Sequence, residues 1–421
     1  MDFRRLPRIA TTLANVTVPG CFLGRTEDLV VTDLHIDGDR ISAVEGTQID
    51  MGGAMVMPAF VDMHTHLDKG HIWPRAANPD GSFAGALGTV RADSSANWTA
   101  KDVERRMDFS LRCAYAHGTR AIRTHIDSLA PQDEISWPVF QELRDAWAGR
   151  IELQGSSLIG VDKMDPDGGY RDTARRVAAS GGVLGVVTYL IEDLKHRVEG
   201  FFRLAMEFGL EVDFHADETM DPTSETLRCI AETVLEMGFE RPVTVGHLCS
   251  LSTQDEARAL DTIDIVAKAG LNVVSLPMCN LYLQDRQRGR TPRGRGITLV
   301  HEMKARGINL SFASDNTRDP FYAYGDLDML EVMREATRIG HLDHSDADWP
   351  LAFSTNPARA CGFDAPSLAP GASADLVIFN ARNWQELYAR PQSDRIVLRE
   401  GEQIDRTLPQ YSELDDLMRT T

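Results

Sequence analysis

Residues 61–68 run Val61-Asp62-Met63-His64-Thr65-His66-Leu67-Asp68 and follow the apolar segment Met55-Val56-Met57-Pro58-Ala59-Phe60. Side chains alternate between the two faces of a β-strand, so residues two apart face the same side. We therefore expect His64 and His66 to point into one space. Two imidazoles on one face begin a metal site, although a histidine pair alone also occurs by chance on protein surfaces.

Seven further short apolar segments follow this stretch and alternate with helix-like segments. They cover residues 119–127, 150–154, 182–187, 210–215, 243–247, 271–276 and 308–315. Helical periodicity is clearest over 102–116, preceded by Thr99 as a candidate N-cap, and over 225–237. Alternating strands and helices predict an α/β fold with a parallel sheet. Eight such units predict a closed (β/α)8 barrel of the TIM type.

The two ends of the chain are β-rich. Apolar segments at 30–36 and 41–44 flank a turn, and further strands are expected within 371–380 and 396–401. We expect both ends to pair as one small β-sandwich domain. The predicted division is 1–57 for its N-terminal part, 58–362 for the metal-dependent barrel and 363–421 for its C-terminal part. The acidic tail, 402–421, is expected to be a solvated terminal helix or strand cover, and no function is inferred from it.

Unusual polar side chains gather where the predicted barrel strands end. The carboxyl ends of barrel strands meet at one rim, so residues far apart in sequence converge there. These residues are His64, His66, His125, Asp127, Gln154, His215, Asp217, Glu218, His247, Asp315 and Asn316. Three histidines and a carboxylate suit one divalent ion, Zn²⁺ or Fe²⁺. The assigned ligands are His64, His66, His215 and Asp315.

This ligand set predicts hydrolytic chemistry, because such an ion supplies hydroxide from bound water near neutral pH. Asp315 is expected both to touch the metal and to accept a proton. His247 would orient or polarise the hydroxide, and Glu218 would shuttle a proton to the substrate.

Each of these residues alone has a plainer interpretation. A lone His215 or His247 is more often a structural histidine, and Asp315 alone could cap a helix. His125 and Asp127 could form a hydrogen-bonded pair that holds the first ligands, and we favour that supporting role for His125. The plainer interpretations explain poorly why four ligand-type residues fall together on strand ends.

Composition excludes several classes of function. A net charge of −19 argues against nucleic acid and against an anionic membrane surface as partners. The sequence has no apolar run long enough to span a bilayer, and its first residues lack the apolar core of a signal peptide. The six cysteines show no C-x-x-C spacing, which favours reduced, mostly buried thiols in a cytoplasmic protein.

Together these motifs resemble the amidohydrolase superfamily over nearly the whole chain, and more narrowly bacterial cytosine deaminase. The superfamily pattern covers residues 58–68, 215–218, 246–247 and 314–315, and the narrower likeness covers 123–127, 153–154, 280–284, 295–298 and 319–322. The resemblance implies that Gln154 binds the amide face of the ring and that Phe321 forms an aromatic wall. It implies that Glu218 protonates a ring nitrogen while His247 steadies the tetrahedral oxygen, and that Asp315 passes a proton to the leaving amine.

Three details qualify the resemblance. Binuclear relatives carry a carbamylated lysine at the end of the fourth strand, whereas residues 182–190 contain no lysine, so one metal is expected. Cytosine deaminase has an aspartate where Asn316 stands, and an amide can donate as well as accept. Lys69 follows His-x-His-Leu-Asp as in the N-alkylammelide amidohydrolases and would add positive charge near the site. Equally, it could be a solvated loop lysine.

We therefore predict a mononuclear metal-dependent deaminase of nucleobase metabolism. It would hydrolyse a C–N bond of a cytosine-like pyrimidine or a related small nitrogen heterocycle and release ammonia. Alternatives are release of an alkylamine from an ammelide-type triazine, ring-opening hydrolysis of a cyclic amide, and a non-catalytic barrel that binds a ligand or serves as a scaffold. Outer helices of such barrels often support homo-oligomers, but the sequence does not give the number of subunits.

Overall fold

The computed structural model describes residues 3–390 and 394–419. Its central strands form two parallel sheets. One contains β6 (Phe60–Thr65), β7 (Thr119–Asp127) and β8 (Glu152–Leu158). The other contains β9 (Leu184–Val187), β10 (Val212–Ala216), β11 (Val243–His247), β12 (Asn272–Ser275) and β13 (Leu310–Phe312).

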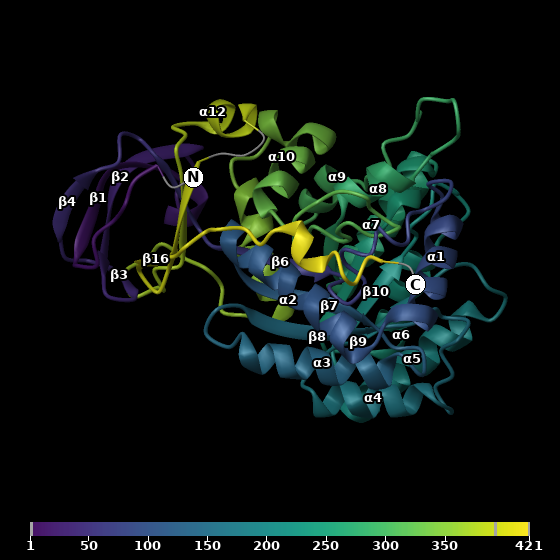
Figure 1. Cartoon of the computed structure of the whole chain (residues 1–421). Coiled ribbons are helices and arrows are strands. Elements are labelled where there is room, and N and C mark those ends of the chain that lie inside the picture. The colour runs from purple at the N-terminus through teal and green to yellow at the C-terminus, as the bar shows by residue number, and fades with distance from the viewer. Residues whose placement is uncertain (1–2, 391–393, 420–421) are drawn as a thin grey trace.

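Single bridges join the edges of these two sheets. Ser156 pairs in parallel with Val183, and Thr65 pairs in parallel with Asp315. Strand neighbours therefore follow chain order from β6 to β13 and return to β6. This arrangement is consistent with the predicted TIM-type barrel, and helices surround the strands in Figure 1.

Helices of the described residues connect successive strands. The α-helices are α1 (Phe83–Asn97), α2 (Ala100–His117), α3 (Asp133–Ala146), α4 (Tyr170–Ala179), α5 (Leu194–Phe208), α6 (Thr226–Met237), α7 (Glu256–Ala269), α8 (Pro277–Leu283), α9 (Val300–Lys304), α10 (Met329–Gly340), α11 (Thr355–Cys361) and α12 (Trp384–Ala389). The 3-10 turns are η1 (Gly20–Leu23), η2 (Cys249–Thr253), η3 (Leu342–His344), η4 (Trp349–Phe353) and η5 (Tyr411–Leu414). The predicted cap of α2 is confirmed, because the Thr99 side chain accepts a hydrogen bond from the Asp102 amide.

The two chain ends pair, as expected, and their strands form one mixed sheet, which is consistent with the predicted β-sandwich. Its strands are β1 (Thr11–Pro19), β2 (Leu29–Asp37), β3 (Arg40–Ser42), β4 (Thr47–Asp50), β5 (Met55–Pro58), β14 (Leu376–Phe379), β15 (Arg395–Arg399) and β16 (Glu402–Gln403). N-terminal β5 pairs antiparallel with C-terminal β14, which joins the two ends directly. The yellow strand β16 accordingly lies beside the purple N-terminal strands in Figure 1, while the end marked C lies away from them. The domain boundaries at residues 57 and 362 stay a prediction.

The predicted end of the third barrel strand is wrong. Residues 155–157, Gly-Ser-Ser, resemble a turn in sequence, but they pair with β7 as far as Asp127 and Leu158. Gln154 is therefore the third residue of β8 and not its last. The eighth strand is shorter than expected, because β13 ends at Phe312 and leaves Asp315 in the loop that follows.

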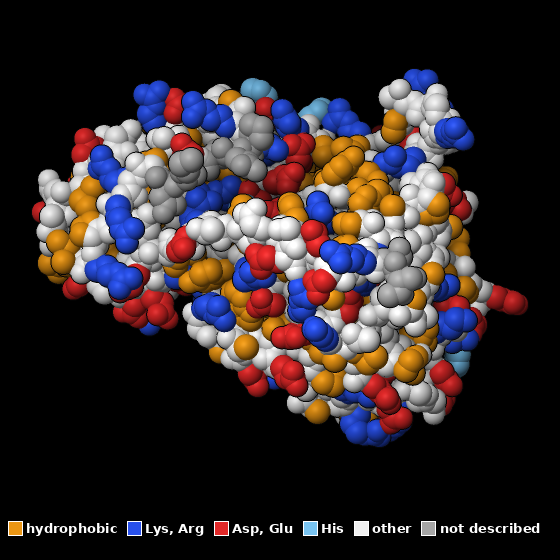
Figure 2. Space-filling model, viewed as in Figure 1, with side chains coloured by type: hydrophobic (Ala, Val, Ile, Leu, Met, Phe, Trp, Pro, Cys, Tyr) orange, Lys and Arg blue, Asp and Glu red, His pale blue; other side chains and the backbone are white. Residues whose placement is uncertain are grey.

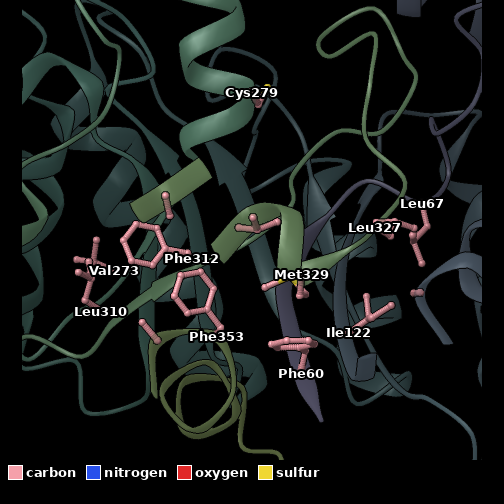
Figure 3. Close-up of a cluster of buried hydrophobic side chains, with 14 of the residues drawn as sticks. Phe60, Leu67, Ile122, Val273, Cys279, Leu310, Phe312, Leu327, Met329 and Phe353 are labelled. Carbon is pink, nitrogen blue, oxygen red and sulfur yellow. The ribbon is translucent and has the colours of Figure 1, made fainter. Parts of the chain in front are cut away.

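Apolar side chains fill the space around the strands (Figure 3). Phe312 of β13 stacks on Phe353 with the ring centroids 5.1 Å apart, and both side chains are fully buried. Ile122 of β7 and Val273 of β12 belong to the same buried cluster. This packing fixes the strands, and so fixes where their ends place polar side chains.

The surface differs from this core. Acidic and basic side chains are interspersed over the face shown in Figure 2. Across the described part of the chain, every helix is too short or too polar to cross a lipid bilayer.

A buried ion pair fastens the mixed sheet to α10. Arg395 of β15 donates from both terminal nitrogens to Asp328, at 2.8 and 2.6 Å, and both side chains are buried. Asp328 also caps α10 by accepting from the Leu330 amide. Burial alone raises the pKa of Asp328, but Arg395 and His117 outweigh burial and hold this pKa well below its ordinary value.

Asp328→Asn should lower the free energy of unfolding by about 3 kcal/mol at pH 7, because it leaves Arg395 buried without a counter-charge. Since the pKa of Asp328 is depressed on folding, its stabilisation is complete above the unfolded pKa and declines as pH falls. The difference between variant and wild type in denaturant midpoint should therefore shrink from pH 5 to pH 3.5.

Glu386→Gln is the matched control, because Glu386 pairs with Arg382 on the surface. It should leave the midpoint unchanged. An equal loss in both variants would contradict the role given to the buried pair.

Candidate metal centre and substrate cavity

Five histidines and one aspartate meet at the carboxyl ends of the barrel strands. His64 lies within β6 and His66 directly after it, while His125, His215 and His247 lie at or near the ends of β7, β10 and β11. Asp315 lies three residues beyond β13 and donates its amide to the His64 carbonyl at 2.9 Å. These side chains are almost completely buried.

The four ligands assigned from the sequence lie together. Asp315 Oδ1 is 3.2 Å from His66 Nε2 and 3.7 Å from His64 Nε2. His215 Nε2 is 3.3 Å from His66 Nε2. Among the described residues, His64, His66 and Asp315 form one group able to hold an ion, and His64, His215 and His247 form another. The assigned ligands span these two overlapping groups.

The chemistry of these donors fits a divalent cation. His64 Nε2 and both carboxylate oxygens of Asp315 are buried and have no hydrogen-bond partner. Burial, with help from neighbouring positive charge, lowers the pKa of His64, His66 and His215 well below the ordinary value. The imidazoles are therefore neutral, the form that binds metals.

A third group, His64, His125 and Asp213, lies beside the ligands. His125 Nε2 is 3.1 Å from His64 Nδ1 and 4.0 Å from Asp213 Oδ1. Arg123 donates to Asp213 Oδ2 at 3.1 Å, so a positive charge already faces this carboxylate. We interpret this group as support that orients His64 and not as a second metal site. The first lysine after β9, Lys195, is the second residue of α5; it pairs with Glu236 and does not line the cavity, so it does not replace the carbamylated lysine of binuclear relatives.

Two site residues have a left-handed backbone that side chains rarely adopt. The φ angle is 74° at His247 and 63° at Asp315. Such strain persists only where the surrounding structure imposes it, and it is common at functional sites. Here it accompanies the turn of both side chains into the barrel mouth, at the last residue of β11 and three residues beyond β13.

Glu218 lies beside His247 in the same buried space. Its Oε1 is 3.5 Å from His247 Nδ1 and accepts from Asn280 Nδ2 at 3.4 Å. Asn280 Nδ2 also lies 3.0 Å from His247 Nδ1. Because an amide nitrogen only donates, Nδ1 accepts, and the ring proton of His247 stays on Nε2, which has no other partner. Burial and the charge of Asp315 raise the pKa of Glu218 well above its ordinary value.

Lys69 is buried and not a solvated loop residue. Its Nζ lies 3.1 Å from Asp127 Oδ1 and 5.5 Å from the centre of the Phe321 ring. Burial lowers the pKa of Lys69, but Asp127 and Asp68 outweigh burial, so the amine stays charged. Asp127 thus pairs with Lys69. The alternative suggested by the sequence, a hydrogen-bonded pair of Asp127 with His125, is not formed.

Asn316 is fixed by its neighbours. Its Nδ2 donates to Asp319 Oδ2 at 2.7 Å, and Asp319 in turn accepts from the amides of Phe321 and Tyr322. Asn316, Lys69 and Phe321 all line the cavity described below.

Gln154 does not reach this space. Its Oε1 accepts from Arg123 Nε at 2.7 Å, and its Nε2 donates to the Cys361 carbonyl at 3.3 Å. It lies four residues before the end of β8 and is not among the cavity-lining residues. The structure therefore does not support the expected contact between Gln154 and the substrate ring. The pairing of β8 with β7 places the Gln154 side chain inside the barrel, below the strand ends that line the cavity.

A cavity of about 740 Å³ opens above the metal-ligand cluster. His66, His215, His247, Glu218 and Asp315 line its floor. Its wall is largely apolar and comes from α1 and from the segments after β7 and β8; it includes Phe83, Leu87, Val90, Leu129, Ile135, Leu158 and Ile159. Reactive groups below an apolar wall are typical of a site for a flat organic molecule.

Asn280 and Asp319 shape this site but are not among the site residues predicted from the sequence. Asn280 directs the proton of His247, and Asp319 holds Asn316 and the backbone beside Phe321. Asn280 falls in α8, one short turn after β12, and Asp319 follows the eighth strand. Both residues follow a barrel strand in the sequence, which could have marked them as candidates. This position alone does not predict which way their side chains point.

Comparisons with known proteins agree with this geometry. A model described as the amidohydrolase family matches residues 47–111 and 167–404. Pterin deaminase of Rhizobium rhizogenes is 52% identical over 420 residues, which cover 96% of each chain. N-isopropylammelide isopropyl amidohydrolase of Pseudomonas sp. is 26% identical and covers 84% of this chain and 89% of its own.

Among solved structures, 5-methylcytosine deaminase from Klebsiella pneumoniae with 5-fluorocytosine superposes with a TM-score of 0.81. It is 26% identical and covers 95% of this chain and 98% of its own. The predicted enzyme class is confirmed: a hydrolase with a histidine-rich metal site that acts on C–N bonds other than peptide bonds. With a family match over most of its length, this chain belongs to the amidohydrolase family.

Proposed function

We propose that this protein is a pterin deaminase, which hydrolyses the exocyclic C2–N bond of a 2-amino-4-oxopteridine to give the 2,4-dioxo compound and ammonia. The observation that carries the proposal is the 52% identity to pterin deaminase along 96% of both chains. Pterin replaces the cytosine-like pyrimidine as the preferred substrate. The two share an amine on a ring carbon flanked by nitrogen, and pterin adds a second ring.

The cavity suits the larger ring system. Its volume of about 740 Å³ exceeds what one six-membered ring needs and lies within the usual range for ligand sites. We propose that the amine-bearing ring faces Glu218 and Asp315, with Asn316, Lys69 and Phe321 around it. The second ring would then lie against the apolar wall formed by α1.

His64, His66, His215 and Asp315 would hold one divalent cation, Zn²⁺ or Fe²⁺, which lowers the pKa of a bound water toward neutrality. Asp315 accepts a proton from the attacking water, and Glu218 delivers a proton to the ring nitrogen beside C2. His247, with its proton on Nε2, donates to the oxygen that forms on C2. The C2–N bond then breaks, and ammonia leaves with the proton that Asp315 took. The proton of the new C2 hydroxyl passes to Glu218 as the carbonyl forms, which restores both carboxyl groups to their starting states.

Two observations favour a second candidate function, the release of an alkylamine from an ammelide-type triazine. Lys69 is buried and lines the cavity, and the N-isopropylammelide amidohydrolase is 26% identical to this chain. The products separate the candidates, because that reaction yields an alkylamine and the proposed one yields ammonia.

The purified, metal-loaded protein should release ammonia from pterin with kcat/KM about 100-fold or more above that for cytosine or N-isopropylammelide, since a bicyclic site contacts more of the pterin transition state. Ammonia release, isopropylamine release and the change in pteridine absorbance measure the three reactions. A higher kcat/KM for cytosine or for the triazine would overturn the proposal.

Glu218→Gln should keep the metal and lose about 10²- to 10⁴-fold in kcat, because the amide cannot deliver the proton. Glu225→Gln is the control, since Glu225 pairs with Arg258 outside the site. Metal content and kcat should both stay normal in the control. Near-normal turnover of Glu218→Gln would show that Glu218 is not the group that delivers the proton.

His215→Ala should abolish stoichiometric metal binding while the fold persists, because it removes one of four ligands. Elemental analysis after dialysis measures the metal, and circular dichroism measures the fold. His301→Ala is the matched control, since His301 bonds the Gly340 carbonyl away from the cavity. One retained equivalent of metal in His215→Ala would show that His215 is not a ligand.

A further inference from the structure

Two loops carry most of the proposed substrate contacts. The β6 loop, residues 66–76, holds His66 and Lys69, and the β13 loop, residues 313–328, holds Asp315, Asn316 and Phe321. The loops meet along their backbones. The His71 amide donates to the Thr317 carbonyl at 3.0 Å, and the Trp73 amide donates to the Arg318 carbonyl at 2.8 Å.

The C-terminal segment, residues 404–419, lies against α2 and over these loops, and the yellow trace crosses that face in Figure 1. Arg112 of α2 binds Glu413 at 2.8 Å, and Arg105 binds Asp416 at 2.5 Å. Leu414 is buried against Phe109. The acidic tail is thus attached to the barrel by ion pairs and by Leu414, while most of its described residues stay exposed or half-buried, in keeping with the solvated cover expected from the sequence.

Tyr411 of this segment contacts both loops. Its hydroxyl donates to Asp326 Oδ1 at 2.9 Å, and the Arg318 guanidinium lies 4.0 Å from its ring centre. Its ring is also 6.3 Å from the buried His71 ring. The Tyr411 ring also stacks on the buried Phe109 ring of α2 at 5.6 Å. Because the Tyr411 side chain is 45% exposed, its replacement removes these contacts without opening a cavity in the core.

We propose that Tyr411 is a positioning residue for the active site. It fastens the β6 loop to the β13 loop from outside the barrel, so that Lys69 faces Phe321 and Asn316 across the substrate. The inference rests on the proposed function for what those residues bind. The loop contact itself can be measured without a substrate.

Tyr411→Ala should raise amide hydrogen exchange in the β6 and β13 loops about 3- to 30-fold, the range expected for loss of one cation–π contact and one hydrogen bond. In the same variant, KM for pterin should rise about 3- to 30-fold with kcat changed less than threefold, since positioning is lost but the reacting groups remain. Metal content should be unchanged. Tyr411→Phe, which keeps the ring, should retain most of the wild-type protection from exchange and a KM close to that of the wild type.

Tyr115→Ala is the matched control. Tyr115 packs on Trp147 at 6.0 Å and under the Arg399 guanidinium at 5.7 Å, and it touches neither loop. If Tyr411→Ala folds poorly, Arg318→Met tests the same contact from its other side. It should raise amide exchange in the same two loops. Unchanged exchange in both loops, or equal changes in Tyr115→Ala, would overturn the inference. Altered exchange without any pterin turnover would instead reject the proposed substrate.

Discussion

The structure depends on one electrostatic constraint: a carboxylate and several imidazoles are buried within about 4 Å of one another without enough hydrogen bonds to satisfy them. Asp315 has two buried oxygens without partners, and His64 Nε2 is likewise unpaired. Such an arrangement is costly unless a cation completes it. The barrel makes the arrangement attainable, because parallel strands bring their ends to one rim and the packed core fixes them there.

Support around the ligands follows from the same constraint. His125 contacts His64, Arg123 neutralises Asp213, and left-handed backbone at His247 and Asp315 turns those side chains inward. The β6 and β13 loops bond each other through their backbones, and Tyr411 of the C-terminal segment donates a hydrogen bond to Asp326 of the β13 loop. Distant parts of the chain therefore contribute to a site whose reacting groups lie on strand ends.

Much of the fold was predictable because strand and helix periodicities are local. The strands at 119–127 and 243–247 match β7 and β11 residue for residue. The ligand cluster was predictable because barrel topology alone brings strand ends together. Gln154 was misplaced because Gly155-Ser156-Ser157 resemble a turn, and only pairing with β7 shows that the strand continues. The Lys69–Asp127 pair and the role of Asn280 depend on where side chains at and beyond the strand ends point, which sequence periodicity does not predict.

Under the proposed function, pterin and cytosine would both lose an exocyclic amine from a ring carbon beside nitrogen, at C2 in pterin and at C4 in cytosine. The second ring of pterin would lie against the apolar wall of the cavity. Either reaction would depend on the mononuclear metal centre proposed at the bottom of the cavity. X-ray absorption at the edge of the bound metal tests it most directly. We predict one metal per chain with three nitrogen ligands and carboxylate or water oxygen at about 2.0–2.2 Å. Sulfur scattering near 2.3 Å, or a metal neighbour within about 4 Å, would contradict the mononuclear histidine–aspartate site.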